Sequence, residues 1–269
     1  MTLEILIPVR NPTEVFDKTV ESLALQTDKN FSVLISDNFS TKGQEHLAAA
    51  LEKLAAAGLA ARQIQPPMEL ERVEHWNWAH HQSQGDWLKP LFVGDWLEPD
   101  YVARLRAAAA HPGCHYVFSN YTLHRTGRPP QLGVPRWGGR FVPAAEMRAL
   151  VLRDGMQFGP PSVAAYQRDA FLAVGCYATA LPITADSLLF CTLAASFGAL
   201  GLDERLCHFN IHNARFSTSL PQKRRDTLRE TMTYCWLLAY HAWTDNVAFS
   251  RVYFARLLAR AWRDHVRGR

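Results

Sequence analysis

The strongest constraint on the fold is the order of apolar segments at the start of the chain. Residues 3–7 (LEILI) form a short, almost wholly apolar run, and residues 31–36 (FSVLIS) form a second one. Between them, Phe16, Val20 and Leu23 recur at the spacing of one helix face. Apolar runs of this kind are typical of parallel strands that are covered on both faces. Strand, helix and strand in this order predict a βαβ unit with a right-handed crossover, and therefore an α/β fold.

The same alternation continues along the chain and predicts a single α/β domain over residues 1–220. Apolar periodicity predicts further helices at residues 44–57, 73–84, 99–110, 169–174 and 186–197. Strands are expected at residues 87–93, 115–119, 162–166 and 206–211. Residues 121–141 are rich in proline, glycine and arginine, which predicts a long surface loop. Residues 221–269 predict a C-terminal helical extension.

The composition excludes several classes of protein. A net charge of +4 over 269 residues suits an anionic substrate or a membrane surface, but it lacks the strong basic bias of a nucleic-acid-binding protein. The five cysteines are scattered without a C-x-x-C pair, which argues against structural zinc and favours a reducing compartment. No signal-peptide core and no apolar stretch of about 18 residues occur. We therefore expect a cytoplasmic protein, soluble or peripheral at the inner face of the membrane.

The loop after the first predicted strand, residues 8–11 (PVRN), lacks the glycines that let a backbone approach a pyrophosphate. No G-x-G-x-x-G follows that strand, and neither G-x-x-x-x-G-K-[ST] nor G-x-S-x-G occurs in the chain. These absences disfavour a dehydrogenase, a P-loop enzyme and an α/β-hydrolase.

Ligands of open α/β sheets bind beyond the carboxyl ends of the strands. Here those ends carry residues 8–11, residues 37–41 (DNFST) and the pair Gly94 and Asp95. Asp37 is placed to accept a hydrogen bond from the imide N–H of a uracil ring. The alternative is an ordinary turn, because Asp, Asn, Ser and Thr are all turn-forming residues. Asn11, followed by Pro12, also reads as a helix N-cap.

Several ordered motifs resemble the family-2 glycosyltransferases, which have the GT-A fold. The segments ILIPVRN, VESLALQT and FSVLISDNFSTKG are similar to the N-terminal half of that family. NWAHHQSQGDWLKPLFVGDWLEPDYV is similar to its N-x-(six to seven)-G-[DE]-[YW] segment and the acidic turn that follows. GPPSVAAYQRDAFLAVGCY, ITADSLLF and LCHFNIHNARFS extend the resemblance, which covers residues 3–217.

The resemblance implies a Rossmann-like, mostly parallel sheet flanked by helices, and an inverting sugar transfer from a nucleotide-diphosphate sugar, UDP-linked, to an acceptor hydroxyl. It assigns the nucleotide sugar to residues at the strand ends and on the following helices. These are Pro8, Val9, Arg10, Asn11, Asp37, Asn38, Arg72, Asn77, Gly94 and Asp95. For Arg72 and Asn77, the alternative is a solvated position on a helix surface.

Asp186 matches the position of the general base, the group that takes a proton from the acceptor hydroxyl. The family commonly carries an [EQ]-D pair there, and Ala185 replaces its first member. An aspartate before an apolar helix is also an ordinary N-cap. His212 matches a histidine that contacts the diphosphate or a metal ion, and Arg215 is placed to balance phosphate charge.

The stretch LFVGDWLEPD, residues 91–100, bears on whether Mn²⁺ or Mg²⁺ is used. Gly94 stands where the resemblance places the usual metal-ligating carboxylate, and glycine offers a hard cation no side-chain oxygen. Asp95 and His212 are then the candidate ligands, and otherwise Arg72 and Arg215 would balance the diphosphate charge. Glu98 and Asp100 are expected to begin the next helix.

The C-terminal extension interleaves aromatic residues with arginines, a mixture that suits either the surface of a membrane or packing on the catalytic domain or another subunit. The resemblance implies a glycan or lipid-linked glycan acceptor and a place in bacterial surface polysaccharide or glycolipid synthesis. A homo-oligomer is compatible with the sequence. Two alternatives remain open: a catalytically weak or inactive relative that binds a nucleotide sugar or a partner, and a nucleotidyltransferase on a similar sheet.

Overall fold

The computed structural model describes residues 1–133, 138–154, 158–211, 229–233, 259 and 262. A ten-stranded sheet runs through these residues in the order β3-β2-β1-β4-β9-β6-β10-β5, with β7 paired to β6 and β8 paired to β10. The strands are β1 (Leu3–Val9), β2 (Ser32–Asp37), β3 (Ala60–Ile64), β4 (Trp87–Pro90), β5 (Trp96–Leu97), β6 (Tyr116–Arg125), β7 (Arg128–Gly133), β8 (Phe141–Val142), β9 (Ala164–Gln167) and β10 (Ala199–Ile211).

The sheet is mostly parallel, as the sequence predicts. Strands β1, β2, β3 and β4 pair in parallel, and β6 pairs in parallel with β10. Strand β9 lies between β4 and β6 and is antiparallel to both, so these two strands run in the same direction as each other. The short strands β5, β7 and β8 add antiparallel pairs at the far side.

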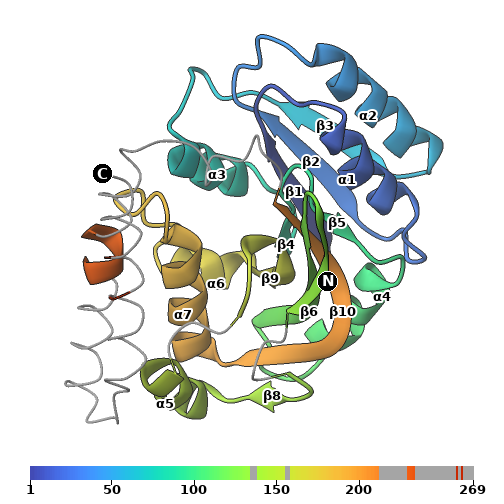
Figure 1. Ribbon diagram of the computed structural model, residues 1–269. Coiled ribbons are helices and arrows are strands. Elements are labelled where there is room, and N and C mark those ends of the chain that lie inside the picture. The colour runs from blue at the N-terminus through green and yellow to red at the C-terminus, as the bar shows by residue number, and fades with distance from the viewer. Residues whose placement is uncertain (134–137, 155–157, 212–228, 234–258, 260–261, 263–269) are drawn as a thin grey trace.

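Helices cover both faces of the sheet (Figure 1). They are α1 (Val15–Ala24), α2 (Gln44–Ala56), α3 (Arg72–His81), α4 (Tyr101–Ala109), α5 (Ala144–Asp154), α6 (Arg168–Ala173) and α7 (Ala185–Phe197). Helices α1 and α2 lie together on one side, while α3, α6 and α7 lie on the other (Figure 1). The chain thus winds outward from β1 to β3 and returns along the opposite face through α3 to β4, which makes the β1–β4 boundary a switch point.

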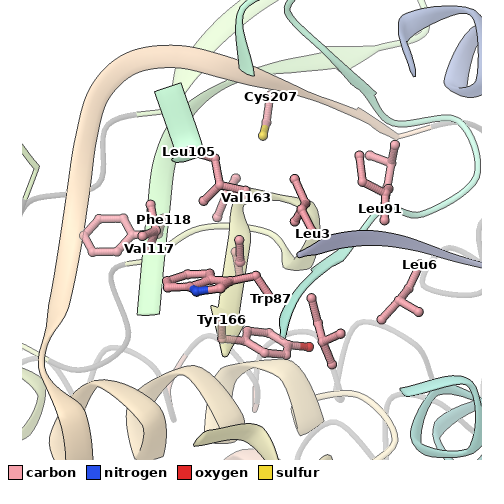
Figure 2. Close-up of a cluster of buried hydrophobic side chains, with 14 of the residues drawn as sticks. Leu3, Leu6, Trp87, Leu91, Leu105, Val117, Phe118, Val163, Tyr166 and Cys207 are labelled. Carbon is pink, nitrogen blue, oxygen red and sulfur yellow. The ribbon is translucent and has the colours of Figure 1, made fainter. Parts of the chain in front are cut away.

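The core joins the two halves of the sheet. All seven residues of β1 are buried, which explains why its sequence is an unbroken apolar run apart from Glu4 and Pro8. Figure 2 shows side chains of β1, β4, α4, β6, β9 and β10 meeting in one cluster, with Trp87 and Phe118 among its largest members. Each large apolar side chain buried in this way contributes about 1.5–3 kcal/mol.

Three predictions about elements were wrong. The first helix begins at Val15 with Glu14 as its N-cap, so Asn11 does not cap it. The expected loop at residues 121–141 instead contains the end of β6, the hairpin strand β7 and the short strand β8. The predicted strand at residues 87–93 ends at Pro90, where the backbone enters a turn. Strands β3 and β5 and helix α5 were not predicted, because their periodic patterns are weak or short.

The C-terminal helices predicted at residues 223–243 and 247–266 lie largely outside the described residues. Within the described part, residues 229–233 are helical and lie beside α7 (Figure 1). No helix in the described part of the chain combines the length and the apolar character that crossing a membrane requires.

Candidate active site

The carboxyl end of β1 lies at the switch point of the sheet, with β2 on one side and β4 on the other. Pro8 and Val9 are buried there, in register with Ser36 and Asp37 of β2. The backbone N–H of Asn38 donates to the carbonyl oxygen of Val9 at 2.9 Å, which extends the pairing into the loops. Two of the predicted segments are therefore brought side by side.

Asn11 joins these two loops. Its backbone has a φ of 49°, a left-handed conformation that asparagine tolerates better than most residues. Its N–H donates to Ser40 Oγ at 2.7 Å, and its side-chain Oδ1 accepts from the N–H groups of Thr41 at 2.8 Å and Lys42 at 3.3 Å. The amide side chain is thus used across the loops rather than on α1, which is why the predicted cap does not form.

Arg10 points to the surface. Its guanidinium pairs with Glu69 at 2.6 Å, and the two side chains are 49% and 53% exposed. An exposed ion pair of this kind stabilises the fold by less than about 1 kcal/mol. Arg10 is therefore available to a ligand at little cost to the fold.

Asp37 is buried at the end of β2, and one of its oxygens is committed to the loop. Oδ1 accepts from the backbone N–H of Ser40 at 3.0 Å and from the Ser40 hydroxyl. These are the hydrogen bonds of this carboxylate within the described residues, so Oδ2 remains for a ligand. The turn interpretation and the base-binding interpretation are thus compatible, because each uses a different oxygen.

His75 of α3 lies close to Asp37, although no motif in the sequence marks it. Its Nε2 lies 2.7 Å from Ser36 Oγ in the buried interior. Burial lowers the pKa of His75 to about 4, although the nearby Asp37 carboxylate opposes that shift. His75 is therefore neutral at physiological pH and adds no positive charge next to Asp37.

Asn38 and Asn77 both use their amides to hold backbone. Asn38 Nδ2 donates to the Leu70 carbonyl at 2.8 Å, and Asn38 Oδ1 accepts from the Leu70 N–H at 3.0 Å. Asn77 makes the same two-way contact with the backbone of Tyr177, at 2.9 Å in each direction. Asn38 thereby fixes the loop before α3, and Asn77 fixes α3 against the segment after α6.

Arg72 and Asp186 are brought together from distant parts of the sequence. Arg72 is the first residue of α3, and its guanidinium carbon lies 4.9 Å from the centre of the Trp76 ring. Burial lowers the pKa of Arg72, while the carboxylates of Asp186 and Glu230 oppose this shift. Asp186 is thus within electrostatic range of a guanidinium.

Asp186 lies in the first turn of α7. The N-cap of this helix is Thr184, so the alternative reading of Asp186 as an ordinary cap is wrong. Asp186 Oδ1 accepts from the Ser187 N–H at 2.8 Å. Burial raises the pKa of Asp186, with the Ser187 hydrogen bond and the Arg72 charge acting in the opposite direction. A carboxylate with a raised pKa is a stronger proton acceptor than a solvated one.

Gly94 occupies a turn between β4 and β5. The N–H of Asp95 donates to the Phe92 carbonyl at 2.9 Å, and Gly94 has a φ of 90°, the conformation of the third residue of a type II turn. Its own N–H donates to Thr19 Oγ1 at 2.9 Å. The turn conformation explains the glycine without any reference to a ligand.

Asp95 is fully buried beneath this turn, and protein groups take both of its oxygens. Oδ1 accepts from the backbone N–H of Asn210 at 3.0 Å, and Oδ2 accepts from the Ser162 hydroxyl at 2.5 Å. The ammonium of Lys89, also fully buried, donates to the carbonyl oxygens of Pro90 and Ser162. Burial lowers the pKa of Lys89 to about 8, while Asp95 and Cys207 oppose that shift.

The described residues do not fit a Mn²⁺ or Mg²⁺ site at this turn. Such cations need several oxygen ligands, and Asp95 is enclosed by its own hydrogen bonds. Nowhere in the described part of the chain do three or more His, Cys, Asp or Glu side chains form a group that could hold a metal ion. His212 and Arg215, the other candidates for metal and diphosphate, lie outside the described residues.

Glu98 and Asp100, expected to begin the next helix, have different contacts. Asp100 is the N-cap residue of α4 and pairs with Arg104 at 3.1 Å. Glu98 Oε1 lies 2.6 Å from His208 Nε2 and so joins the turn after β5 to β10.

Comparison with known proteins gives one family. The sequence profile described as Glycosyl transferase family 2 matches residues 4–175, from β1 to the end of the α6 region. The comparison with curated proteins finds no significant match.

Solved structures with the same fold include glycosyltransferases. S. aureus TarS 1–349 in complex with UDP-GlcNAc is 14% identical, with a TM-score of 0.64 over 99% of this chain and 73% of that chain. The mannosyltransferase PcManGT from Pyrobaculum calidifontis, in complex with GDP-Man and Mn²⁺, is also 14% identical, with a TM-score of 0.62 over 97% of this chain and 73% of that chain. At this identity the likeness concerns the fold, which is the GT-A arrangement expected from the sequence.

Proposed function

This chain belongs to glycosyl transferase family 2, and on that premise we propose that it transfers a sugar from a UDP-linked donor to an acceptor hydroxyl with inversion. The observation that carries the proposal is Asp186, a carboxylate in the first turn of α7 whose pKa burial raises. Arg72 lies within electrostatic range of Asp186, so the proposed general base and a positive charge lie close together.

Asp37 supports a uracil-containing donor. One carboxylate oxygen orders its own loop, and the other has no hydrogen-bond partner within the described residues. A carboxylate accepts from the imide N–H of uracil, and such charge-assisted hydrogen bonds are stronger than neutral ones. The complex of TarS with UDP-GlcNAc is consistent with this choice of base.

In the proposed reaction, Asp186 takes the proton of the acceptor hydroxyl as that oxygen attacks the anomeric carbon. The bond between this carbon and the diphosphate oxygen breaks, and UDP leaves with the electron pair. One displacement inverts the anomeric centre. We assign no step to a cation, because protein groups take both oxygens of Asp95, the described candidate ligand. Arg72 and Arg215 remain our candidates for balancing the diphosphate charge.

The acceptor and the setting rest on the family alone. We propose a glycan or lipid-linked glycan acceptor in surface polysaccharide or glycolipid synthesis, at the cytoplasmic side of a membrane. Residues 221–269 are proposed as a helical extension of the catalytic domain at residues 1–220. Contact of that extension with lipid, or with a second copy of the chain, is part of the same proposal.

The test is an assay of hydrolysis and transfer with a panel of UDP- and GDP-linked sugars, run with Mn²⁺ and with EDTA. We expect turnover of a UDP-sugar, a loss of turnover in Asp186→Asn, and a product whose anomeric configuration is opposite to that of the donor by NMR. Turnover that survives in Asp186→Asn would refute the assignment of the base.

The second candidate is a binding protein without turnover. The enclosed carboxylate of Asp95 favours it, because this side chain is not free to help hold a cation that would stabilise a leaving diphosphate. This candidate predicts that UDP binds, that no sugar is transferred or hydrolysed, and that Asp186→Asn changes neither result.

A further inference from the structure

Glu230, in the described part of the C-terminal extension, contacts the segment that leads into α7. It belongs to the helical residues 229–233, which lie beside α7 in Figure 1, and its side chain is fully buried. Its Oε2 accepts hydrogen bonds from the backbone N–H of Ile183 at 2.9 Å, the N–H of Thr184 at 3.0 Å and the Thr184 hydroxyl at 3.1 Å. One oxygen thus holds the segment that leads into α7.

These contacts act on the two residues just before α7, Ile183 and the N-cap residue Thr184. A helix begins with N–H groups that have no partner within the helix, and a side chain at the N-cap often accepts from them. Thr184 occupies the N-cap of α7 but makes no such bond, and its hydroxyl donates to Glu230 instead. A carboxylate is also favoured at this end of a helix by the helix dipole.

The same carboxylate belongs to the charge cluster that includes Asp186. Asp186 follows Thr184 by two residues, so holding the Thr184 backbone fixes where the first turn of α7 presents its carboxylate. Arg72 lies within electrostatic range of both Asp186 and Glu230, and both carboxylates favour its charged form. Arg72 is therefore shared between two acids, one on α7 and one on the C-terminal extension.

Stability alone is a poor explanation for Glu230. Its Oε1 is buried and has no hydrogen-bond partner among the described residues. An oxygen left in this state costs stability, and a charged one costs more than a neutral one. The charge of Arg72, which lies within electrostatic range, offsets part of that cost.

We propose that Glu230 is a positioning residue for the transfer reaction, which holds the start of α7 so that Asp186 faces the acceptor hydroxyl. On this proposal the C-terminal extension contributes a residue that positions the active site. This inference rests on the proposed function, because it requires Asp186 to act as the base.

The experiment compares Glu230→Gln, Glu230→Ala and Thr184→Val in the full chain. The control is Met232→Ala, since Met232 lies in the same helical residues and its side chain is 56% exposed. We expect Glu230→Gln to lower kcat by about 10- to 100-fold, the size of effect that a small misplacement of a reacting group produces. The KM for the donor should change less than about twofold, because the base-binding contact of Asp37 is untouched.

Two readouts separate positioning from general damage. Removing the Glu230 charge leaves Arg72 to Asp186 alone, so the acid limb of the kcat–pH profile should move to lower pH in Glu230→Gln. Hydrogen exchange of the Ile183 and Thr184 amides should be faster in Glu230→Ala. Thr184→Val removes one of the three hydrogen bonds and should give a smaller loss of kcat in the same direction.

The outcomes are distinct. A wild-type kcat with an unmoved acid limb in Glu230→Gln overturns the inference even if the amides exchange faster, and so does an increase in kcat. If the wild-type chain transfers no sugar from any donor, the proposed function fails and the positioning role of Glu230 fails with it. Exchange at residues 183 and 184 would then still report whether the contact itself exists.

Discussion

The Ser162 hydroxyl donates a hydrogen bond of 2.5 Å to Oδ2 of Asp95, in a part of the core from which solvent is excluded. The other oxygen of Asp95 accepts from the Asn210 backbone, so the carboxylate ties the turn after β4 to the end of β10. Asp95, which the sequence makes a candidate metal ligand, joins these segments through its two oxygens. Gly94 beside it has the conformation of a turn glycine.

From this arrangement we expect transfer activity to be nearly independent of divalent cations. The enzyme, freed of metal with EDTA and assayed with EDTA present, should keep its rate within about twofold, because a hard cation finds too few oxygen ligands at the described turn. The control is a cation-dependent glycosyltransferase in the same buffer. A loss of activity that Mn²⁺ restores would contradict the prediction and would place the ligands among residues beyond the described ranges.

Lys89 and Asp95 should depend on each other for stability. Lys89→Met leaves the buried carbonyl oxygens of Pro90 and Ser162 without the ammonium that donates to them, and each such loss costs about 1–3 kcal/mol of the free energy of unfolding. Asp95→Asn should destabilise in turn, because the Lys89 ammonium then lacks its carboxylate. The double variant should lose less than the sum of the two single variants. Urea unfolding of all four proteins measures this coupling, and strictly additive losses would show that the two groups do not interact.

The first half of the fold follows from local sequence, because its signals are short-range. Wholly apolar runs and a helix-spaced apolar face are enough to define β1, α1 and β2. The connectivity then places Pro8 and Asp37 at one edge of the sheet, where a ligand would be sought. The position of Asp37 at this edge of the sheet could therefore be predicted from the sequence, and so could the family.

The remaining features depend on contacts between distant segments. The antiparallel strand β7 has proline and arginine where a strand would show alternation, so its pairing with β6 had no local signal. The role of Asp95 depends on Ser162 and Asn210, which follow it by 67 and 115 residues. Glu230 had no motif at all, since its partners at Ile183 and Thr184 are backbone and hydroxyl groups.

Asp37→Asn should weaken the binding of UDP while leaving the loop intact. The asparagine Oδ1 can still accept from Ser40, but an amide nitrogen cannot accept from the imide of uracil. A hydrogen bond to a charged group contributes about 1.5–3 kcal/mol, so we expect the dissociation constant to rise by about 10- to 150-fold. Isothermal titration with UDP measures this change.

Ser40→Ala serves as the matched control for Asp37→Asn. It removes the hydroxyl that donates to Oδ1 and accepts from the Asn11 N–H, but it keeps the carboxylate, so its effect on UDP binding should be the smaller of the two. Equal losses in both variants would mean that Asp37 shapes the loop and does not contact the base.

Asp186→Asn should remove catalysis without destabilising the fold. Loss of a general base lowers kcat by about 10²–10⁴-fold. The wild-type kcat should fall as the pH drops through the pKa of Asp186 in the folded protein, which burial places above the ordinary value of 3.8. This acid limb should be absent from any residual rate of the variant.

Asp186→Asn should not lower stability, whereas the loss of a carboxylate that is held by an ion pair would. Because the pKa of Asp186 is raised on folding, the folded state binds this proton more tightly than the unfolded state does, and ionisation at higher pH lowers stability. The neutral asparagine avoids that cost. Thermal unfolding at neutral pH should therefore give a Tm equal to or above that of the wild type, and a Tm that falls together with kcat would mark Asp186 as a structural residue.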